Sequence, residues 1–193
     1  MKTVFFDIDS QLDFLYPAGA LYVPGAERIV AAIARLNRYA AQHGITVVST
    51  TDAHAENDPE FSTWPPHCIA GTTGQHKAEA TLLERRVVIP NRKCELALEG
   101  TSQIVVEKQT VDVFAAPNLH LVVAHLKADR YVVYGVVTEI CVLFAVRGLL
   151  KTGKPVTVVT DAVETLKPED GVRALQSICA AGGTLARASE LVG

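Results

Sequence analysis

Hydrophobic and polar residues form blocks along the chain, and each block has the period of one kind of secondary structure. Short apolar runs, many of them β-branched, predict buried strands at 3–9, 45–51, 86–90, 103–107, 155–160 and in the first part of 130–150. Apolar residues spaced three or four apart predict helices at 26–43, 117–128, 138–150 and 168–181. This alternation predicts an α/β fold with three α/β/α layers around a central, mostly parallel, Rossmann-like sheet.

Composition narrows the class of protein. The 193 residues fit one domain, 1–193, and the content of 49% hydrophobic and 20% charged residues is globular. A net charge of -3 with scattered Lys and Arg gives no reason to expect nucleic acid, and no apolar run reaches the roughly 20 residues of a membrane span. Four cysteines without a CxxC pair and no signal peptide favour a cytoplasmic protein with a small-molecule partner.

Polar side chains follow several of the expected strands, at the edge where parallel sheets bind ligands. Asp9 ends the first strand, Lys108 follows the 103–107 strand, and Cys141 follows the 130 strand. Thr138 is the expected N-cap, which places Cys141 in a first helical turn where a thiolate is favoured. A thiol, an ammonium and a carboxylate suffice for hydrolysis through a thioester, so we predict a triad of Cys141 as nucleophile, Asp9 as proton carrier and Lys108 as supporting cation. The simpler alternative is that Cys141 only fills space in the core.

A second group of residues has the spacing of metal ligands. Asp52 and His54 are two positions apart on one side of an extended segment, and His67 follows a turn fixed by two prolines. We call these three the metal set. They suit a catalytic divalent metal, preferably zinc, with iron or manganese as alternatives. They could also be ordinary polar loop residues, because Asp-x-His is common by chance. The long segment that carries them, 52–78, is expected to cover the site.

These motifs, in this order, resemble the isochorismatase-like cysteine hydrolases and, within them, the nicotinamidases. The motifs are Asp9-Ser-Gln-Leu-Asp13-Phe14, Pro24-Gly25, Asp52-Ala-His54, Trp64-Pro-Pro-His67-Cys68 with Gly71-Thr72 and Gly74, Lys108, and Gly135-Val-Val-Thr-Glu-Ile-Cys141-Val. They span nearly the whole chain, so the resemblance is specific for the superfamily.

The resemblance implies the same triad, together with features that the residues alone do not predict. One is a cis peptide bond between Val136 and Val137. Another is an oxyanion hole formed by the backbone N–H groups of Val137 and Cys141, where charge develops during acyl transfer.

The resemblance also implies a substrate and its contacts. Phe14 and Trp64 would flank an aromatic ring, Ile140 would lie beside it, and a metal on the metal set would bind the pyridine nitrogen. The implied reaction converts a small heteroaromatic carboxamide such as nicotinamide to nicotinate and ammonia. A fourth protein ligand to the metal has no clear match. Relatives of this kind often form dimers or tetramers, so a homo-oligomer is expected.

Other functions stay open at this point. The superfamily includes isochorismatases and carbamoyl or ureido amidases, and a degenerate hydrolase could serve as a binding subunit. The opening segment with Asp7 and Asp9 also resembles the first motif of haloacid-dehalogenase-type phosphatases, although Gln11 and Leu12 stand where that family carries a small hydroxyl residue.

Overall fold

The computed structural model describes residues 1–192, and Gly193, the last residue of the expected domain, lies outside them. Seven parallel strands form one sheet in the order β3-β4-β2-β1-β5-β6-β7. The strands are β1 Thr3–Ile8, β2 Thr46–Asp52, β3 Arg86–Ile89, β4 Gln103–Lys108, β5 Arg130–Gly135, β6 Val156–Val163 and β7 Thr184–Ala186. The α-helices are α1 Leu12–Leu15, α2 Val30–Gln42, α3 Leu119–Leu126, α4 Leu143–Leu150, α5 Pro168–Ala180 and α6 Ala188–Leu191. None of the described helices has the length and apolar character needed to cross a membrane.

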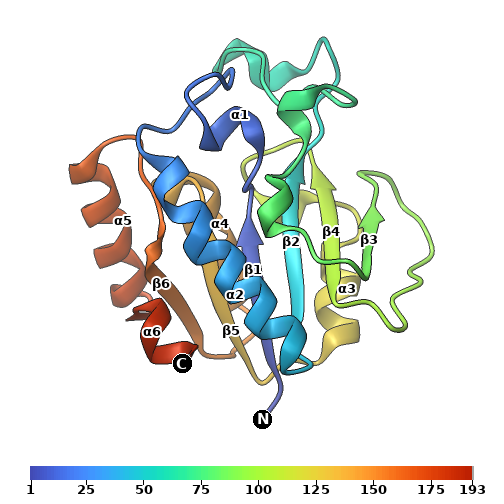
Figure 1. The fold of residues 1–193 in the computed structure, drawn as a ribbon, viewed down its shortest axis with the longest axis vertical. Coiled ribbons are helices and arrows are strands. Elements are labelled where there is room, and N and C mark those ends of the chain that lie inside the picture. The colour runs from blue at the N-terminus through green and yellow to red at the C-terminus, as the bar shows by residue number, and fades with distance from the viewer. Residues whose placement is uncertain (193) are drawn as a thin grey trace.

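Helices cover both faces of the sheet, as Figure 1 shows with α2 in front of the sheet and α3 and α4 behind it. Successive side chains of β1 point to opposite faces of the sheet. Phe6 and Ile8 pack into a core with apolar residues of α3, α4 and α5, whereas Phe5 packs into a second core with α2 and α6. The predicted three-layer α/β/α architecture with a parallel sheet is therefore confirmed.

Most predicted elements are present, with small shifts at their ends. The segment expected to be one helix from 26 to 43 begins as a 3-10 turn at Ala26–Ile29 and becomes α-helical only from Val30. Lys108 is the last residue of β4 rather than the residue after it. Three short elements, α1, β7 and α6, have three or four residues each and were not predicted.

The turn after β5 differs from the prediction in its capping. Residues Thr138–Val142 form a π-helical turn that leads into α4, and Val137 occupies the N-cap position. Thr138 does not cap this turn. Its hydroxyl and its backbone N–H both donate to the carbonyl of Glu164, at 2.7 and 2.8 Å. The prediction of Thr138 as N-cap is therefore wrong, because its side chain ties the turn to the segment after β6 instead.

The chain bends sharply where β1 and β5 end side by side. Gly135 pairs with Ile8 and has a φ of 118°, and a Cβ atom there would collide with the Ile8 carbonyl oxygen. Only glycine accepts both the conformation and the close approach. The next peptide bond, between Val136 and Val137, is cis, as the resemblance implies. Asp9, directly after β1, also has a positive φ, 47°.

Candidate active site and metal centre

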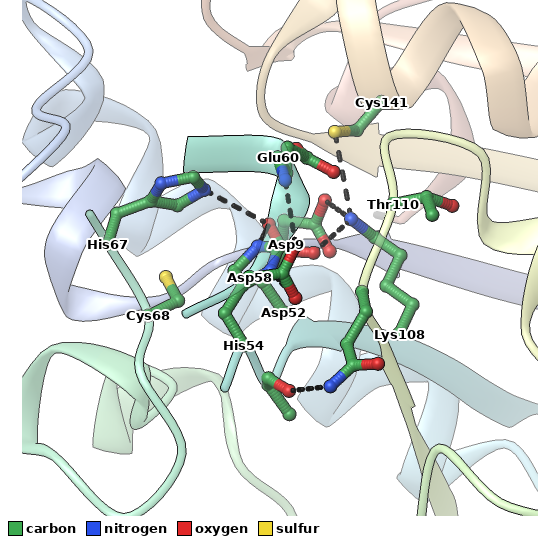
Figure 2. A network of polar contacts seen from close by, with 12 residues as sticks. Asp9, Asp52, His54, Asp58, Glu60, His67, Cys68, Lys108, Thr110 and Cys141 are labelled. Atoms are coloured by element: carbon green, nitrogen blue, oxygen red, sulfur yellow. Dashed lines mark hydrogen bonds and ion pairs between the residues drawn. The ribbon is translucent and has the colours of Figure 1, made fainter. Parts of the chain in front are cut away.

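The three residues of the predicted triad meet at the carboxyl edge of the sheet. Asp9 lies just beyond β1, Lys108 ends β4, and Cys141 lies in the turn after β5. Lys108 Nζ is 2.9 Å from Asp9 Oδ2 and 3.8 Å from Cys141 Sγ, so the ammonium lies between the acid and the thiol (Figure 2). Three segments far apart in the sequence thus supply one continuous set of contacts.

Burial and charge set the protonation of this group. Burial would lower the pKa of Lys108, but the carboxylates of Asp52 and Asp9 raise it well above its ordinary value, so the lysine is charged. Burial raises the pKa of Asp9, and the Lys108 ammonium offsets part of that rise. Burial also raises the pKa of the Cys141 thiol well above its ordinary value, despite Lys108 nearby. Burial therefore opposes the thiolate that the position in the first turn of a helix was expected to favour.

Thr50 on β2 holds the Asp9 carboxylate in place. The Thr50 hydroxyl donates to Asp9 Oδ1 at 2.5 Å, and Thr50 Oγ1 accepts the backbone N–H of Asp9 at 3.1 Å. These contacts direct the other carboxylate oxygen toward Lys108. No motif in the sequence marks Thr50. The available clue was its position near the end of a strand whose carboxyl edge faces the site.

The metal set also converges. Asp52, His54 and His67 are buried, and their candidate ligand atoms lie within 4.8 Å of one another. Asp52 Oδ2 is 3.8 Å from Nε2 of each histidine. The other ring nitrogen of each has an acceptor close by: Pro65 O lies 2.8 Å from His67 Nδ1, and Asp58 Oδ2 lies 3.0 Å from His54 Nδ1. Both rings therefore turn Nε2 toward the same carboxylate.

A divalent metal fits this arrangement. Both ring nitrogens of His54 are buried without a well-aligned hydrogen bond among the described residues. Nδ1 has the Asp58 carboxylate 3.0 Å away, whereas Nε2 faces only Asp52 at 3.8 Å, which is costly unless a ligand uses it. One carboxylate and two imidazoles form a common three-ligand set that leaves positions open for substrate or water. The Asp/His/His set is thus a possible metal site, and its donors suit zinc as well as iron or manganese.

Asp52 links the metal set to the triad. Its Oδ1 forms an ion pair with Lys108 Nζ, while Oδ2 faces the two histidines. Burial alone would raise the pKa of Asp52, but the ammonium holds it well below its usual range, so the group is a carboxylate. The side-chain amide of Gln11 fixes its backbone: Gln11 Oε1 accepts Asp52 N–H at 2.7 Å, and Gln11 Nε2 donates to Asp52 O at 2.9 Å.

A small pocket of about 30 Å³ opens onto both sets. Phe14, Trp64 and Ile140 line it, as do Val137 and Cys141, whose N–H groups are the expected oxyanion donors. The 52–78 segment contributes part of its wall, in line with the expectation that this segment covers the site. Sequence reasoning missed the remaining apolar wall and assigned no role to one carboxylate. These lining residues are Leu21, Val23, Glu60, Val111 and Leu166.

Leu166 is held in place by a contact with the Thr138–Val142 turn. Glu139, two residues before Cys141, accepts the Thr165 hydroxyl at 2.6 Å and the Leu166 N–H at 2.9 Å. The segment after β6 is thereby held against the pocket. No local sequence pattern connects residues 139 and 166, so only the fold reveals this wall.

Among the described residues, the Asp and Glu side chains of the pocket lining are not balanced by a lysine or arginine in that lining. The lining includes the carboxylates of Asp9, Asp52 and Glu60, and no lysine or arginine lines the pocket in the described part of the chain. Burial raises the pKa of Glu60, and the Asp52 carboxylate adds to that effect. The nearby Lys108 ammonium is already engaged by two carboxylates. A negatively charged ligand group would therefore lack an arginine or lysine partner in the pocket wall.

Comparison with known proteins identifies the family of this chain. Residues 3–190 match the model of the isochorismatase domain, and the chain belongs to that family. The nicotinamidase of Escherichia coli (strain K12) is 25% identical, with 92% of this chain and 91% of that protein covered. The crystal structure of pyrazinamidase of Pyrococcus horikoshii in complex with zinc is 27% identical, with a TM-score of 0.83 over 97% of this chain and 99% of that one.

An N-carbamoylsarcosine amidase from Thermoplasma acidophilum shares the fold as well, with a TM-score of 0.81, 23% identity, and full coverage of both chains. The chain is therefore an isochorismatase-family hydrolase. The phosphatase alternative is wrong, since Asp7 lies outside the pocket, fully buried, with Oδ2 within 3.2 Å of Lys77 Nζ, Ser49 Oγ and Asn37 Nδ2.

Proposed function

We propose that this hydrolase is a cysteine-dependent amidase that cleaves a small heteroaromatic carboxamide, preferably nicotinamide, to the carboxylate and ammonia. The observation that carries the proposal is the position of Lys108. Its ammonium contacts the acid and the thiol on one side and Asp52 of the metal set on the other. Residues of the triad, which would cleave the amide, and residues of the metal set, which would anchor the ring, therefore line the same pocket.

The residues have complementary roles in the proposed reaction. Asp9 accepts the Cys141 proton as Sγ attacks the amide carbon, and the N–H groups of Val137 and Cys141 stabilise the oxyanion. Asp9 then gives that proton to the departing ammonia. A water molecule, deprotonated by Asp9, attacks the thioester, releasing the carboxylic acid and restoring the thiol. Lys108 stays charged and orients Asp9 and Cys141.

The metal set would hold a divalent ion, and such an ion would bind the ring nitrogen of the substrate as a Lewis acid. Zinc is our first choice, because the zinc-containing pyrazinamidase has the same fold. Phe14 and Trp64 line the pocket and would contact the ring, since flat aromatic faces favour one another. Glu60 lies on the same pocket wall and is the nearest candidate for a further ligand from the 52–78 segment.

Pocket charge favours a neutral amide over the alternatives. Isochorismate and N-carbamoyl amino acids carry carboxylates, which would need a cationic partner to leave water. No lysine or arginine lines the pocket in the described part of the chain, and the proposed metal, itself a cation, would already hold the ring nitrogen. Nicotinamide and pyrazinamide are uncharged and planar, and the aliphatic wall with Ile140 and Leu166 suits the apolar part of such rings.

The proposal is tested by substrate hydrolysis with the purified chain. We expect ammonia release from nicotinamide and pyrazinamide at kcat/KM values at least tenfold above those for aliphatic amides and ureido acids. Isochorismate hydrolysis is assayed by the release of pyruvate, and we expect none. Preference for a ureido acid or for isochorismate would contradict the proposed substrate class while leaving the hydrolase family intact.

A further inference from the structure

Asp58 contacts the metal set from outside the pocket and uses its two carboxylate oxygens for different partners. Oδ2 lies 3.0 Å from His54 Nδ1, and Oδ1 accepts the backbone N–H of Glu60 at 2.9 Å. The Asp58 side chain is only 7% exposed. It is therefore a nearly buried carboxylate held between a candidate metal ligand and the short turn Pro59–Ser62.

The contact with His54 has a chemical consequence for metal binding. An imidazole that binds a metal through Nε2 carries its proton on Nδ1, and an acceptor for that proton fixes both the tautomer and the ring orientation. A carboxylate acceptor also makes the ring a stronger ligand. His67 has a neutral acceptor in the corresponding place, the Pro65 carbonyl. Of the two histidines, His54 is the one supported by charge.

The contact with Glu60 adds a second effect. Asp58 is the N-cap of the Pro59–Ser62 turn, which carries Glu60 into the pocket lining and Phe61 against both histidines. The Phe61 ring centre lies 5.2 Å from that of His54 and 5.7 Å from that of His67. One carboxylate thus orients a ligand and positions the turn that closes over the metal set.

We propose that Asp58 is a positioning residue for the metal centre, which aims His54 Nε2 at the metal and holds the 59–62 turn beside it. This inference rests on the metal site of the proposed function. It adds to that function a residue that determines how tightly the metal is held.

Two substitutions separate the two contacts of Asp58. Asp58→Asn and Asp58→Ser both keep an oxygen able to cap the 59–62 turn, since Asn and Ser are good N-caps. Neither supplies a carboxylate to His54 Nδ1. The metal-stripped full-length chain is titrated with Zn²⁺ in competition with a chelator, and with Co²⁺ followed by its visible absorption. We expect both variants to bind Zn²⁺ about 10- to 100-fold more weakly than the wild type does, and we expect their Co²⁺ spectra to differ from the wild-type spectrum.

Asp112 offers a matched control. Its side chain accepts the Phe114 N–H at 2.9 Å and caps the Val113–Ala115 turn in the same manner, without touching the metal set. Asp112→Asn should leave metal affinity and the Co²⁺ spectrum unchanged. The melting temperature of each metal-free variant should stay near that of the wild type.

The outcomes are distinct. Wild-type affinity and an unchanged spectrum in both Asp58 variants would overturn the role of Asp58 and leave the proposed amidase intact. An equal loss in Asp112→Asn would also overturn it, because the effect would then follow capping or charge in general. If the wild-type chain binds neither Zn²⁺ nor Co²⁺, the metal part of the proposed function falls together with this inference.

Discussion

Asp52 and Lys108 occupy paired positions at the ends of β2 and β4, and their side chains form a buried ion pair at the boundary between the triad and the metal set. Lys108 also contacts Asp9 and Cys141, while the other oxygen of Asp52 faces the two histidines. A change at either residue therefore disturbs both sets. The cation that would support the chemistry also balances a ligand of the candidate metal site.

The ion pair predicts a large effect of Lys108 on stability. Lys108→Met would leave two buried carboxylates, Asp9 and Asp52, without their cation, and breaking a buried pair in this way costs about 3 to 5 kcal/mol. We expect the urea midpoint of unfolding to fall accordingly, along with loss of activity. Arg173→Met is the control, because its partner Asp170 forms an exposed pair worth less than about 1 kcal/mol. Equal midpoints for the two variants would contradict the prediction.

Cys141 should be required for turnover but not for binding. Cys141→Ala removes the sulfur that would form the proposed thioester, so we expect amide hydrolysis to fall by at least about a thousandfold. Calorimetry should still detect nicotinamide binding, because the ring contacts and the metal set remain. Cys179→Ala, at an exposed cysteine, is the matched control and should retain full activity. Hydrolysis by Cys141→Ala at the wild-type rate would exclude the thioester mechanism.

Thr50 should affect the rate more than substrate affinity. Thr50→Val keeps the shape of the side chain but removes the hydroxyl that holds Asp9 Oδ1. Hydrogen bonds to charged groups contribute about 1.5 to 3 kcal/mol, so kcat should fall about 10- to 100-fold with KM nearly constant. Thr157→Val is the control for loss of a threonine hydroxyl. The hydroxyl oxygens of Thr157 and Thr184 are 2.9 Å apart, and this pair lies away from the site. A change confined to KM would show that Thr50 acts on substrate binding instead.

Metal removal should weaken substrate binding. Dialysis against a chelator would leave Asp52, His54 and His67 without the ion that is proposed to anchor the ring nitrogen, so KM for nicotinamide should rise. Added zinc, iron or manganese should restore it, since this donor set accepts each of them. Kinetics that do not respond to chelation, in a sample shown by elemental analysis to be metal-free, would identify a metal-independent amidase.

Much of the architecture could be predicted because hydrophobic period and chain order determine it. The runs at β1 and β5 are mostly apolar and almost wholly buried, as is typical of central parallel strands, and their ends locate Asp9 and Cys141. The elements that were missed have too few residues to show a period. In α6, for example, Ala188–Leu191 spans about one helical turn.

The parts of the site that sequence reasoning missed depend on contacts between distant segments. Thr138 resembles a helix cap locally, but Glu164, 26 residues away, takes both of its polar hydrogens. Leu166 reaches the pocket only because Glu139 holds its backbone. Asp58 looks like one of several acidic loop residues until the fold places it against His54. Such pairings follow from tertiary structure, and no short motif encodes them.

The close approach of Gly135 to the Ile8 carbonyl has a consequence for how this catalyst can evolve. The strand that leads to the acid and the strand that leads to the sulfur touch through a position with no side chain. Any added carbon there would wedge the two strands apart and move Asp9 away from the turn that carries Cys141. The spacing of these two strand ends is thus set by a missing methyl group at a residue that does not itself line the pocket.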